Sequence, residues 1–329
     1  MTLTDYKNIW ILAEVQRGKL SAASYELLTA GQKLANDLGE KLCAVLIGHN
    51  VALFAQDLIS HGADIVYVCD DAHLENYVDD IYAKVVTDLI QKYKPNKFLM
   101  PATNSGRALS AKVAVFAKTG LTANATDVQI NKADGQLYVT RPTFGGNLMA
   151  TITCAKTRPE MCSLHPMSYE AAPVKQGHKG EVVHFAFDEK KYTSLVKFLE
   201  FIKCNRSDLD LSQSDIIVAG GRGVGNKEGF DLLKKLADRL GGAVAASRPP
   251  VDNGWADARC QIGLTGCTVK PKLYIACGIS GQLQHMAGVT GADTIVAINK
   301  DPNAPIMKMA HYAVVGDFRE VIPAMLDAL

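Results

Sequence analysis

Short, continuous apolar runs alternate with longer amphipathic stretches up to about residue 120. Within the amphipathic stretches, apolar residues recur at the three- and four-residue spacing of a helix. Continuous apolar runs are typical of strands buried on both faces of a parallel sheet, and the intervening helices cover those faces. The pattern therefore predicts an α/β domain with a doubly wound parallel sheet. The expected strands are 8–13, 42–47, 64–68 and 97–100, with helices at about 22–38, 74–93 and up to 118.

From residue 124 the pattern changes to shorter segments separated by turn residues. Glycine-containing turns at 131–135 and 144–146 separate them, which favours an antiparallel extension of the first domain. Residues 188–212 are charged and only weakly periodic, so they are interpreted as a connection between domains. We therefore expect domains at 1–205 and 206–329. The strands expected before this connection are 125–130, 136–141, 147–154, a short segment after Arg158, and 181–187.

The alternation resumes in the second half, where strands end in Gly, Ser, Arg, Asn or Asp. A helix is expected from Lys227 to Leu240, and another at the C-terminus. In open α/β sheets, ligands bind at the carboxyl ends of the strands. The pattern predicts a second doubly wound, Rossmann-like sheet with a ligand site at that edge. The expected strands are 215–219, 243–246, 273–277, 294–298 and 312–315.

The stretch Leu273–His285 carries the strongest ligand signal. An apolar strand ends in a Gly-x-Ser-Gly turn, in which Ser280 is expected to cap a following helix and Gly281 to allow a close backbone approach. Backbone N–H groups at such a turn favour an anionic ligand atom. Gln282, Gln284 and His285 add polar side chains. A plain connection between strand and helix is the other interpretation.

The neighbouring strand ends carry further candidates. Arg222 lies in the glycine-rich turn 220–225, whose spacing departs from the strict dinucleotide motif. Arg248 precedes two prolines that stiffen its backbone, and a guanidinium there could stabilise electron density on a flavin ring. The threonine of 261–266 could bond a ring nitrogen, while Asn299 and Asp317 suit ribose or adenine groups. A surface arginine and ordinary turns are the alternative interpretations.

Composition narrows the function classes. Lys and Arg number 35 against 34 Asp and Glu, with no basic block, so nucleic-acid binding is not expected. No apolar run has the length of a membrane span and the N-terminus lacks a secretory pattern, so no membrane insertion and a cytoplasmic location are expected. The eight cysteines are scattered without C-x-x-C or zinc spacing, so no metal site is expected.

Together these segments resemble the alpha subunit of electron transfer flavoprotein, the EtfA/FixB family. The resemblance spans nearly all of 215–329, while the first half is compatible in length and pattern. The matching segments are Val218-Ala-Gly-Gly-Arg-Gly223, Ala246-Ser-Arg248, Gln261-Ile-Gly-Leu-Thr-Gly266, Leu273-Tyr-Ile-Ala-Cys-Gly-Ile-Ser-Gly-Gln-Leu-Gln-His285, Ile295-Val-Ala-Ile-Asn-Lys-Asp-Pro302 and Ala304-Pro-Ile306.

The resemblance implies an alpha/beta heterodimer whose alpha C-terminal domain holds one FAD. It places Arg222 and the Ser280–Gln282 turn at the pyrophosphate, and Ser247 and Arg248 beside the isoalloxazine, where Arg248 would stabilise the reduced anion. Thr265 would face flavin N5. The implied cofactor-binding residues are Arg222, Gly223, Ser247, Arg248, Ile262, Gly263, Leu264, Thr265, Ser280, Gly281, Gln282, Leu283, Gln284, His285, Asn299 and Asp317.

Three of these residues, Arg248, Thr265 and His285, are implied to tune the flavin directly. Gln284 and His285 would face its ribityl and N1–C2=O side, and Asn299 and Asp317 its adenosine end. The implied bacterial protein would carry electrons from acyl-CoA dehydrogenases. Leu264 and Gln282 depart from common family residues, and both are compatible with relatives that bifurcate electrons from NADH.

Bifurcation would use a second FAD in the beta subunit and ferredoxin or flavodoxin as acceptor, and it stays open here. Two other functions also stay open. One is an NAD-dependent dehydrogenase on the same sheet, which would need the strict glycine motif and an acidic residue about 20 positions on. The other is a nucleotide-binding module that uses the turn Pro101–Arg107, for which a helix start capped by Ser105 or Asn104 is the alternative.

Overall fold

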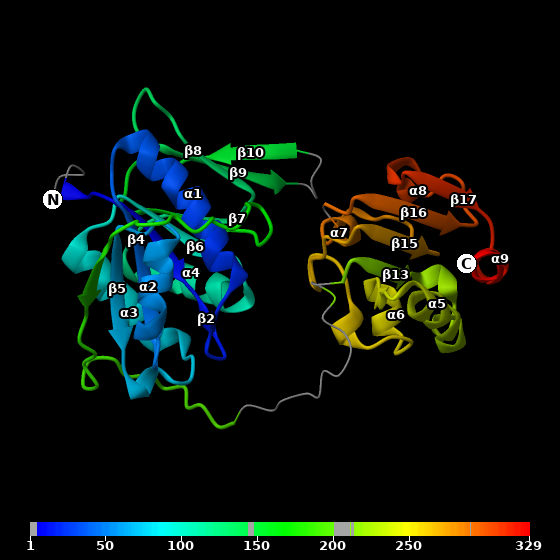
Figure 1. The fold of residues 1–329 in the computed structure, drawn as a ribbon, viewed down its shortest axis with the longest axis horizontal. Coiled ribbons are helices and arrows are strands. Elements are labelled where there is room, and N and C mark those ends of the chain that lie inside the picture. The colour runs from blue at the N-terminus through cyan, green and yellow to red at the C-terminus, as the bar shows by residue number, and fades with distance from the viewer. Residues whose placement is uncertain (1–4, 144–147, 201–210, 212–213, 290) are drawn as a thin grey trace. The chain divides into compact units, whose positions relative to one another are not determined.

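A computed structural model of the chain describes residues 5–143, 148–200, 211, 214–289 and 291–329. The chain divides into two compact units, Met1–Phe201 and Ile202–Leu329 (Figure 1). The boundary expected at 205 falls on residues outside the described ones. Each unit is treated by itself below.

The first unit is built on a parallel sheet in the order β12-β5-β4-β1-β6-β11-β7. All of its strand pairs are parallel. A separate antiparallel sheet, β10-β9-β8, and a small β2-β3 hairpin complete the unit. The main-sheet strands are β1 Ile9–Ala13, β4 Leu42–Gly48, β5 Ile65–Asp70, β6 Lys97–Pro101, β7 Leu121–Ala125, β11 Glu160–Leu164 and β12 Glu181–His184; the others are β2 Val15–Gln16, β3 Lys19–Leu20, β8 Asp127–Ile130, β9 Leu137–Thr143 and β10 Leu148–Ile152.

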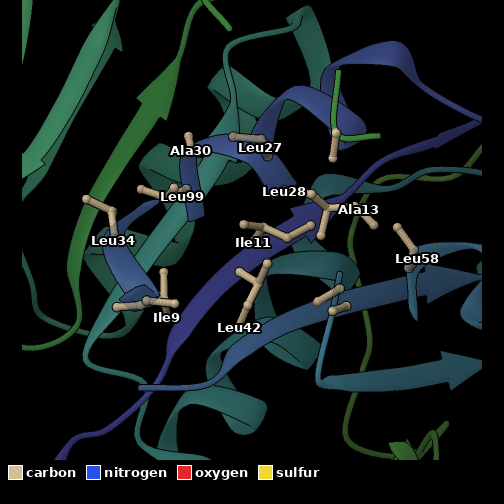
Figure 2. Packing of buried hydrophobic residues seen from close by; sticks show 14 of the residues in the cluster. Ile9, Ile11, Ala13, Leu27, Leu28, Ala30, Leu34, Leu42, Leu58 and Leu99 are labelled. Atoms are coloured by element: carbon tan, nitrogen blue, oxygen red, sulfur yellow. The ribbon is translucent and has the colours of Figure 1, made fainter. Parts of the chain in front are cut away.

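Helices cover both faces of this sheet because its strands are apolar on both sides. Ile9 and Ile11 of β1 point toward α1 and pack against Leu28 and Leu34 (Figure 2). Trp10 on the opposite face joins a second core with α3 and α4. The helices of this unit are α1 Ala22–Leu38, α2 Ala55–Ser60, α3 Asp79–Tyr93 and α4 Asn104–Phe116, with short 3-10 turns η2 Ala52–Phe54 and η3 Ala72–Leu74.

Three local expectations for this unit are wrong. The helix expected from residue 74 begins at Asp79, where Asp79 and Asp80 occupy the first turn and suit the positive end of the helix dipole. Thr103, not residue 104 or 105, caps α4, since its hydroxyl accepts from Gly106 N. The strand expected at 125–130 begins later, as the antiparallel β8, because Ala125 ends β7, an additional strand of the parallel sheet.

The second unit has one parallel sheet in the order β14-β13-β15-β16-β17. Numbered from its first strand, the order is 2-1-3-4-5, one of the two common doubly wound arrangements. The α/β class with two doubly wound sheets and an antiparallel extension is thus confirmed. The elements are β13 Ile216–Gly220, η6 Arg222–Val224, α5 Lys227–Leu240, β14 Ala243–Ala246, α6 Arg248–Asp252, η7 Ala258–Cys260, β15 Leu273–Cys277, α7 Leu283–Met286, β16 Thr294–Asn299, α8 Pro305–Met309, β17 Tyr312–Val315 and α9 Phe318–Ala328.

The second sheet also has a core on each face. Leu233 and Leu236 of α5 and Ile322 of α9 pack on one side. Met286 of α7 and Ile306 of α8 pack on the other. Helices therefore cover both faces of this sheet. The loops that follow its strands lie at its carboxyl edge. Among the described residues, no helix is both long and apolar enough to cross a bilayer.

Candidate functional site

The strand order of the second unit reverses between β13 and β15. Their carboxyl ends diverge into separate loops at this point, which is where doubly wound sheets bind ligands. All five strands are parallel, so the loops after them meet at the same edge. This edge brings together the turns predicted from sequence at 220–225, 247–248, 278–282, 299 and 316–317.

The loop after β15 presents backbone donors at this edge. The N–H groups of Ser280, Gly281 and Gln282 donate to no acceptor among the described residues. Gly281 has φ +80°, and a Cβ on it would lie 2.5 Å from Ile306. Gln282, not Ser280, is the cap residue of α7, because the left-handed turn at Gly281 delays the helix. Leu283, half-buried, then begins α7.

The glycine-rich turn after β13 packs directly on the turn after β15. Gly221 N donates to Cys277 O over 2.9 Å, and Gly223 N donates to Gly278 O over 3.0 Å. A Cβ on Gly221 would lie 2.2 Å from the Gly278 oxygen. These glycines therefore serve close backbone packing, and the Gly223 N–H is already used. Gly223 is exposed. Its contact with a cofactor stays a prediction.

Two cationic side chains lie at the same edge. Arg222 is exposed at the start of η6. Arg248 is also exposed at the start of α6, and its Nε lies 3.2 Å from a carboxylate oxygen of Asp252 one helical turn on. An exposed pair of this kind contributes little to stability. The guanidinium is therefore available to a ligand. Ser247, which precedes it, is buried and fixed by its N–H bond to Gly220 O.

The loop 261–267 runs beside the end of β14. Ile262 is buried, and its N–H donates to Ala246 O over 2.9 Å. Gln261 Nε2 donates to Thr265 Oγ1 over 2.8 Å. Since the threonine oxygen accepts this bond, its hydroxyl hydrogen can be donated elsewhere. Thr265 is exposed, so it can serve as a donor to a ligand atom such as flavin N5.

This loop is also joined to α7. Leu264 N donates to Gln284 O over 2.8 Å, while 57% of the Leu264 residue surface is exposed. Gly263 has φ +139°, and a Cβ there would lie 2.7 Å from the same Gln284 oxygen. The Gln284 side chain is exposed. The arrangement places an apolar side chain and a polar one at the same edge.

His285 lies in the interior. Its Nδ1 is 3.1 Å from Ile262 O, and its Nε2 is 2.8 Å from the Tyr274 hydroxyl. Burial lowers the pKa of His285, with the Ile262 bond acting in the opposite direction. The predicted contact of this ring with a flavin stays a prediction, and it would require one of these bonds to be exchanged.

Asn299 and Asp317 have structural partners of their own. Asn299 Nδ2 donates to Ile279 O over 2.8 Å, which fastens the end of β16 to the β15 loop. Asp317 caps α9 through Arg319 N and lies 2.8 Å from Lys300 Nζ. The hydrogen bond from Lys300, followed by that from Arg319 N, lowers the pKa of Asp317. Their roles toward an adenosine group stay predictions.

Sequence reasoning did not single out two residues that contact candidate site residues, Gln261 beside Thr265 and Tyr274 beside His285. Both lie inside segments that carried the resemblance, but neither side chain was assigned a role. The spacing of Gln261 four residues before Thr265 was the available signal for the first. Nothing in the sequence marked the second, because Tyr274 lies in an apolar strand. Across the described ranges, no cluster of three or more His, Cys, Asp or Glu could hold a metal ion.

Comparison with known proteins decides the family. The Electron transfer flavoprotein domain matches residues 9–190, and the Electron transfer flavoprotein FAD-binding domain matches residues 210–290. An electron transfer flavoprotein subunit alpha of Thermoanaerobacterium thermosaccharolyticum is 48% identical over 99% of both chains. This chain belongs to the electron transfer flavoprotein alpha-subunit family. The resemblance inferred from the sequence motifs is thereby confirmed.

Two further relatives show the range of this family. An electron transfer flavoprotein subunit alpha of Megasphaera elsdenii is 45% identical, over 100% of this chain and 98% of its own length. The LctC subunit of a lactate dehydrogenase (NAD(+),ferredoxin) of Acetobacterium woodii is 39% identical over 98% of this chain and 77% of its own length. The relatives therefore include a subunit named for a dehydrogenase as well as subunits named only as electron transfer flavoprotein subunit alpha.

Proposed function

We propose that this alpha subunit binds one FAD at the carboxyl edge of the β13–β17 sheet and acts as an electron carrier. The observation that carries this proposal is the convergence at the sheet's switch point of unpartnered backbone donors, two exposed guanidinium groups and a threonine hydroxyl. This set matches a dinucleotide with an anionic pyrophosphate and a polar ring edge.

Each group has a proposed task. The N–H groups of Ser280–Gln282 and the Arg222 cation would hold the pyrophosphate. Thr265 would donate its hydroxyl hydrogen to flavin N5, and Arg248 would favour negative charge on the ring. Bound FAD supplies the ability to accept and release electrons. The protein binds and orients that group, and it needs no general acid or base of its own for this.

The carrier would work as a heterodimer with an electron transfer flavoprotein beta subunit. Family membership supports this partner. We propose an acyl-CoA dehydrogenase as electron donor, since an acryloyl-CoA reductase electron transfer subunit of Anaerotignum propionicum is 38% identical over 99% of this chain. A cytoplasmic location stays a prediction.

We also propose that the heterodimer bifurcates electrons from NADH, with ferredoxin or flavodoxin as one acceptor. The name of the Acetobacterium woodii relative, which pairs NAD(+) with ferredoxin, supports this extension. The exposed Leu264 and Gln282 side chains lie in the loops assigned to the flavin, where the sequence departs from common family residues. A second FAD would lie in the beta subunit.

The heterodimer purified with its natural beta subunit tests these proposals in one series. A visible spectrum and a count of extracted FAD are followed by titration with NADH. One FAD that NADH does not reduce would indicate a simple carrier, and two FADs bleached by NADH would indicate bifurcation. An intact heterodimer without flavin would overturn the proposal. NAD(H) binding by a flavin-free chain would instead support a dehydrogenase.

Replacing Arg248 by alanine is expected to lower the first-electron reduction potential of the flavin. The cause is the loss of an exposed cation whose interaction with ring charge is on the order of 1 kcal/mol, equivalent to about 40 mV for one electron. Spectroelectrochemical titration of the FAD-loaded heterodimer measures the shift. Arg239→Ala is the matched control, because Arg239 is in the last turn of α5. An unchanged potential in Arg248→Ala would remove Arg248 from this role.

A further inference from the structure

The hydrogen bonds of His285 determine where its proton lies. Main-chain carbonyls only accept hydrogen bonds, so the contact between Nδ1 and Ile262 O requires a hydrogen on Nδ1. The opposite nitrogen, Nε2, faces the Tyr274 hydroxyl at 2.8 Å. Which atom donates in this second contact depends on the tyrosine.

Tyr274 must donate in that contact. Its side chain is fully buried in β15, and burial raises the pKa of its hydroxyl, so the hydroxyl keeps its proton. Among the described residues, His285 Nε2 is its one hydrogen-bond partner. A proton on Nε2 would leave the tyrosine hydrogen without an acceptor in a buried interior, which is unfavourable. Nε2 is therefore unprotonated.

The bond from His285 to Ile262 joins α7 to the loop that contains Thr265. The same loop is joined to α7 a second time, by Leu264 N and Gln284 O. Ile262 and His285 are both buried, so water does not compete for the bond between the imidazole and Ile262 O. The bond from the imidazole is thus one of the contacts that position the Thr265 loop, and Tyr274 of β15 bonds the opposite ring nitrogen.

We infer that Tyr274 is a positioning residue that fixes His285 as the neutral Nδ1–H tautomer. In this state the imidazole holds the Thr265 loop against α7 and has no ring N–H left to donate to a flavin. The inference rests on the proposed flavin site for its functional meaning, and it assigns His285 to the support of that site. Charge stabilisation of the ring would then come from Arg248 and backbone donors.

The tautomer can be measured on the unmodified protein. The heterodimer is prepared with ¹⁵N-labelled histidine, and long-range ¹H–¹⁵N spectra are recorded near neutral pH, with His285→Gln used to assign the signal. The expected result is a pyrrole-type Nδ1 and a pyridine-type Nε2, the reverse of the tautomer that free histidine favours. A pyrrole-type Nε2, or a doubly protonated ring, would overturn the inference.

Tyr274→Phe then tests the role of the hydroxyl. We expect the Nε2 resonance of His285 to move away from its wild-type position, since the nitrogen loses the hydroxyl donor that the described residues give it. Tyr67→Phe is the matched control, because Tyr67 is also a buried strand tyrosine but belongs to the first unit. An Nε2 resonance unchanged in Tyr274→Phe would remove the tyrosine from this role.

FAD is counted on the same samples, which separates the two proposals. The expected tautomer in a heterodimer that lacks flavin would uphold the tyrosine–histidine pair and overturn the flavin site. A full complement of FAD with the other tautomer would do the reverse, and would return His285 to the set of candidate flavin donors.

Discussion

Replacing Gly221 by alanine is expected to abolish FAD retention by the heterodimer. Gly221 has φ −103°, a conformation that alanine adopts readily, so the effect is purely steric. The new Cβ would lie 2.2 Å from Gly278 O and 2.7 Å from Ile279 Cα. Both atoms belong to the backbone, which cannot rotate away as a side chain can. The turn after β15, which carries the proposed pyrophosphate donors, must therefore move.

The cost of such a clash is typically about 1–3 kcal/mol in a packed interior, and it falls here on one loop. FAD per heterodimer after gel filtration measures the result, together with the thermal unfolding midpoint. Gly254→Ala is the control, because Gly254 has φ +70° but open space around its Cβ. The control should lose roughly 1–2 kcal/mol of stability through backbone strain and keep its flavin. Full FAD retention in Gly221→Ala would contradict the assigned packing.

Much of this fold could be predicted because its signals are local. The strands expected at 42–47 and 243–246 follow from continuous apolar runs, and both are confirmed as buried or mostly buried strands. The helix from Lys227 to Leu240 has the expected bounds, since Asn226 caps its start and glycine follows its end. Parallel strands place their carboxyl ends together, which is why the candidate edge could be recognised in advance.

Pairing between distant strands could not be predicted in the same way. β11 begins at Glu160 yet inserts between β6 and β7, so the sheet order depends on contacts more than 30 residues apart in sequence. The glycine-rich turn 220–225 was a candidate part of a ligand site, whereas Gly221 and Gly223 pack on the β15 loop. A glycine needed for a ligand and one needed for a neighbouring backbone have the same sequence signature.

The sequence also did not indicate which way the His285 side chain points. His285 lies four residues after Gly281, at the expected ligand edge, and its chemistry suits a flavin. Its ring nevertheless turns inward to Ile262 and Tyr274. The amphipathic pattern of a four-residue helix is too short to indicate which of its side chains face the core.

The other large effect on stability is expected at a buried ion cluster in the first sheet. Lys97 and Glu160 are paired opposite each other in β6 and β11, and their side chains are 0% and 1% exposed. Glu160 Oε1 lies 3.0 Å from Lys97 Nζ and 2.8 Å from Arg158 Nη1, and Oε2 accepts from Leu137 N. Burial lowers the pKa of Lys97, and the Glu160 carboxylate opposes this shift. One carboxylate therefore compensates two cations.

Glu160→Gln is expected to destabilise the first unit by about 3–5 kcal/mol, because it keeps the side-chain volume but leaves the buried Lys97 and the partly buried Arg158 uncompensated. Lys97→Met should cost less, since Glu160 keeps Arg158 and the Leu137 N–H as partners. Urea unfolding monitored by circular dichroism gives the loss of unfolding free energy in both variants. Asp215→Asn, which breaks an exposed pair with Lys272, is the control and should leave the unfolding free energy nearly unchanged. Equal costs for Glu160→Gln and Lys97→Met would show that the carboxylate does not serve both cations.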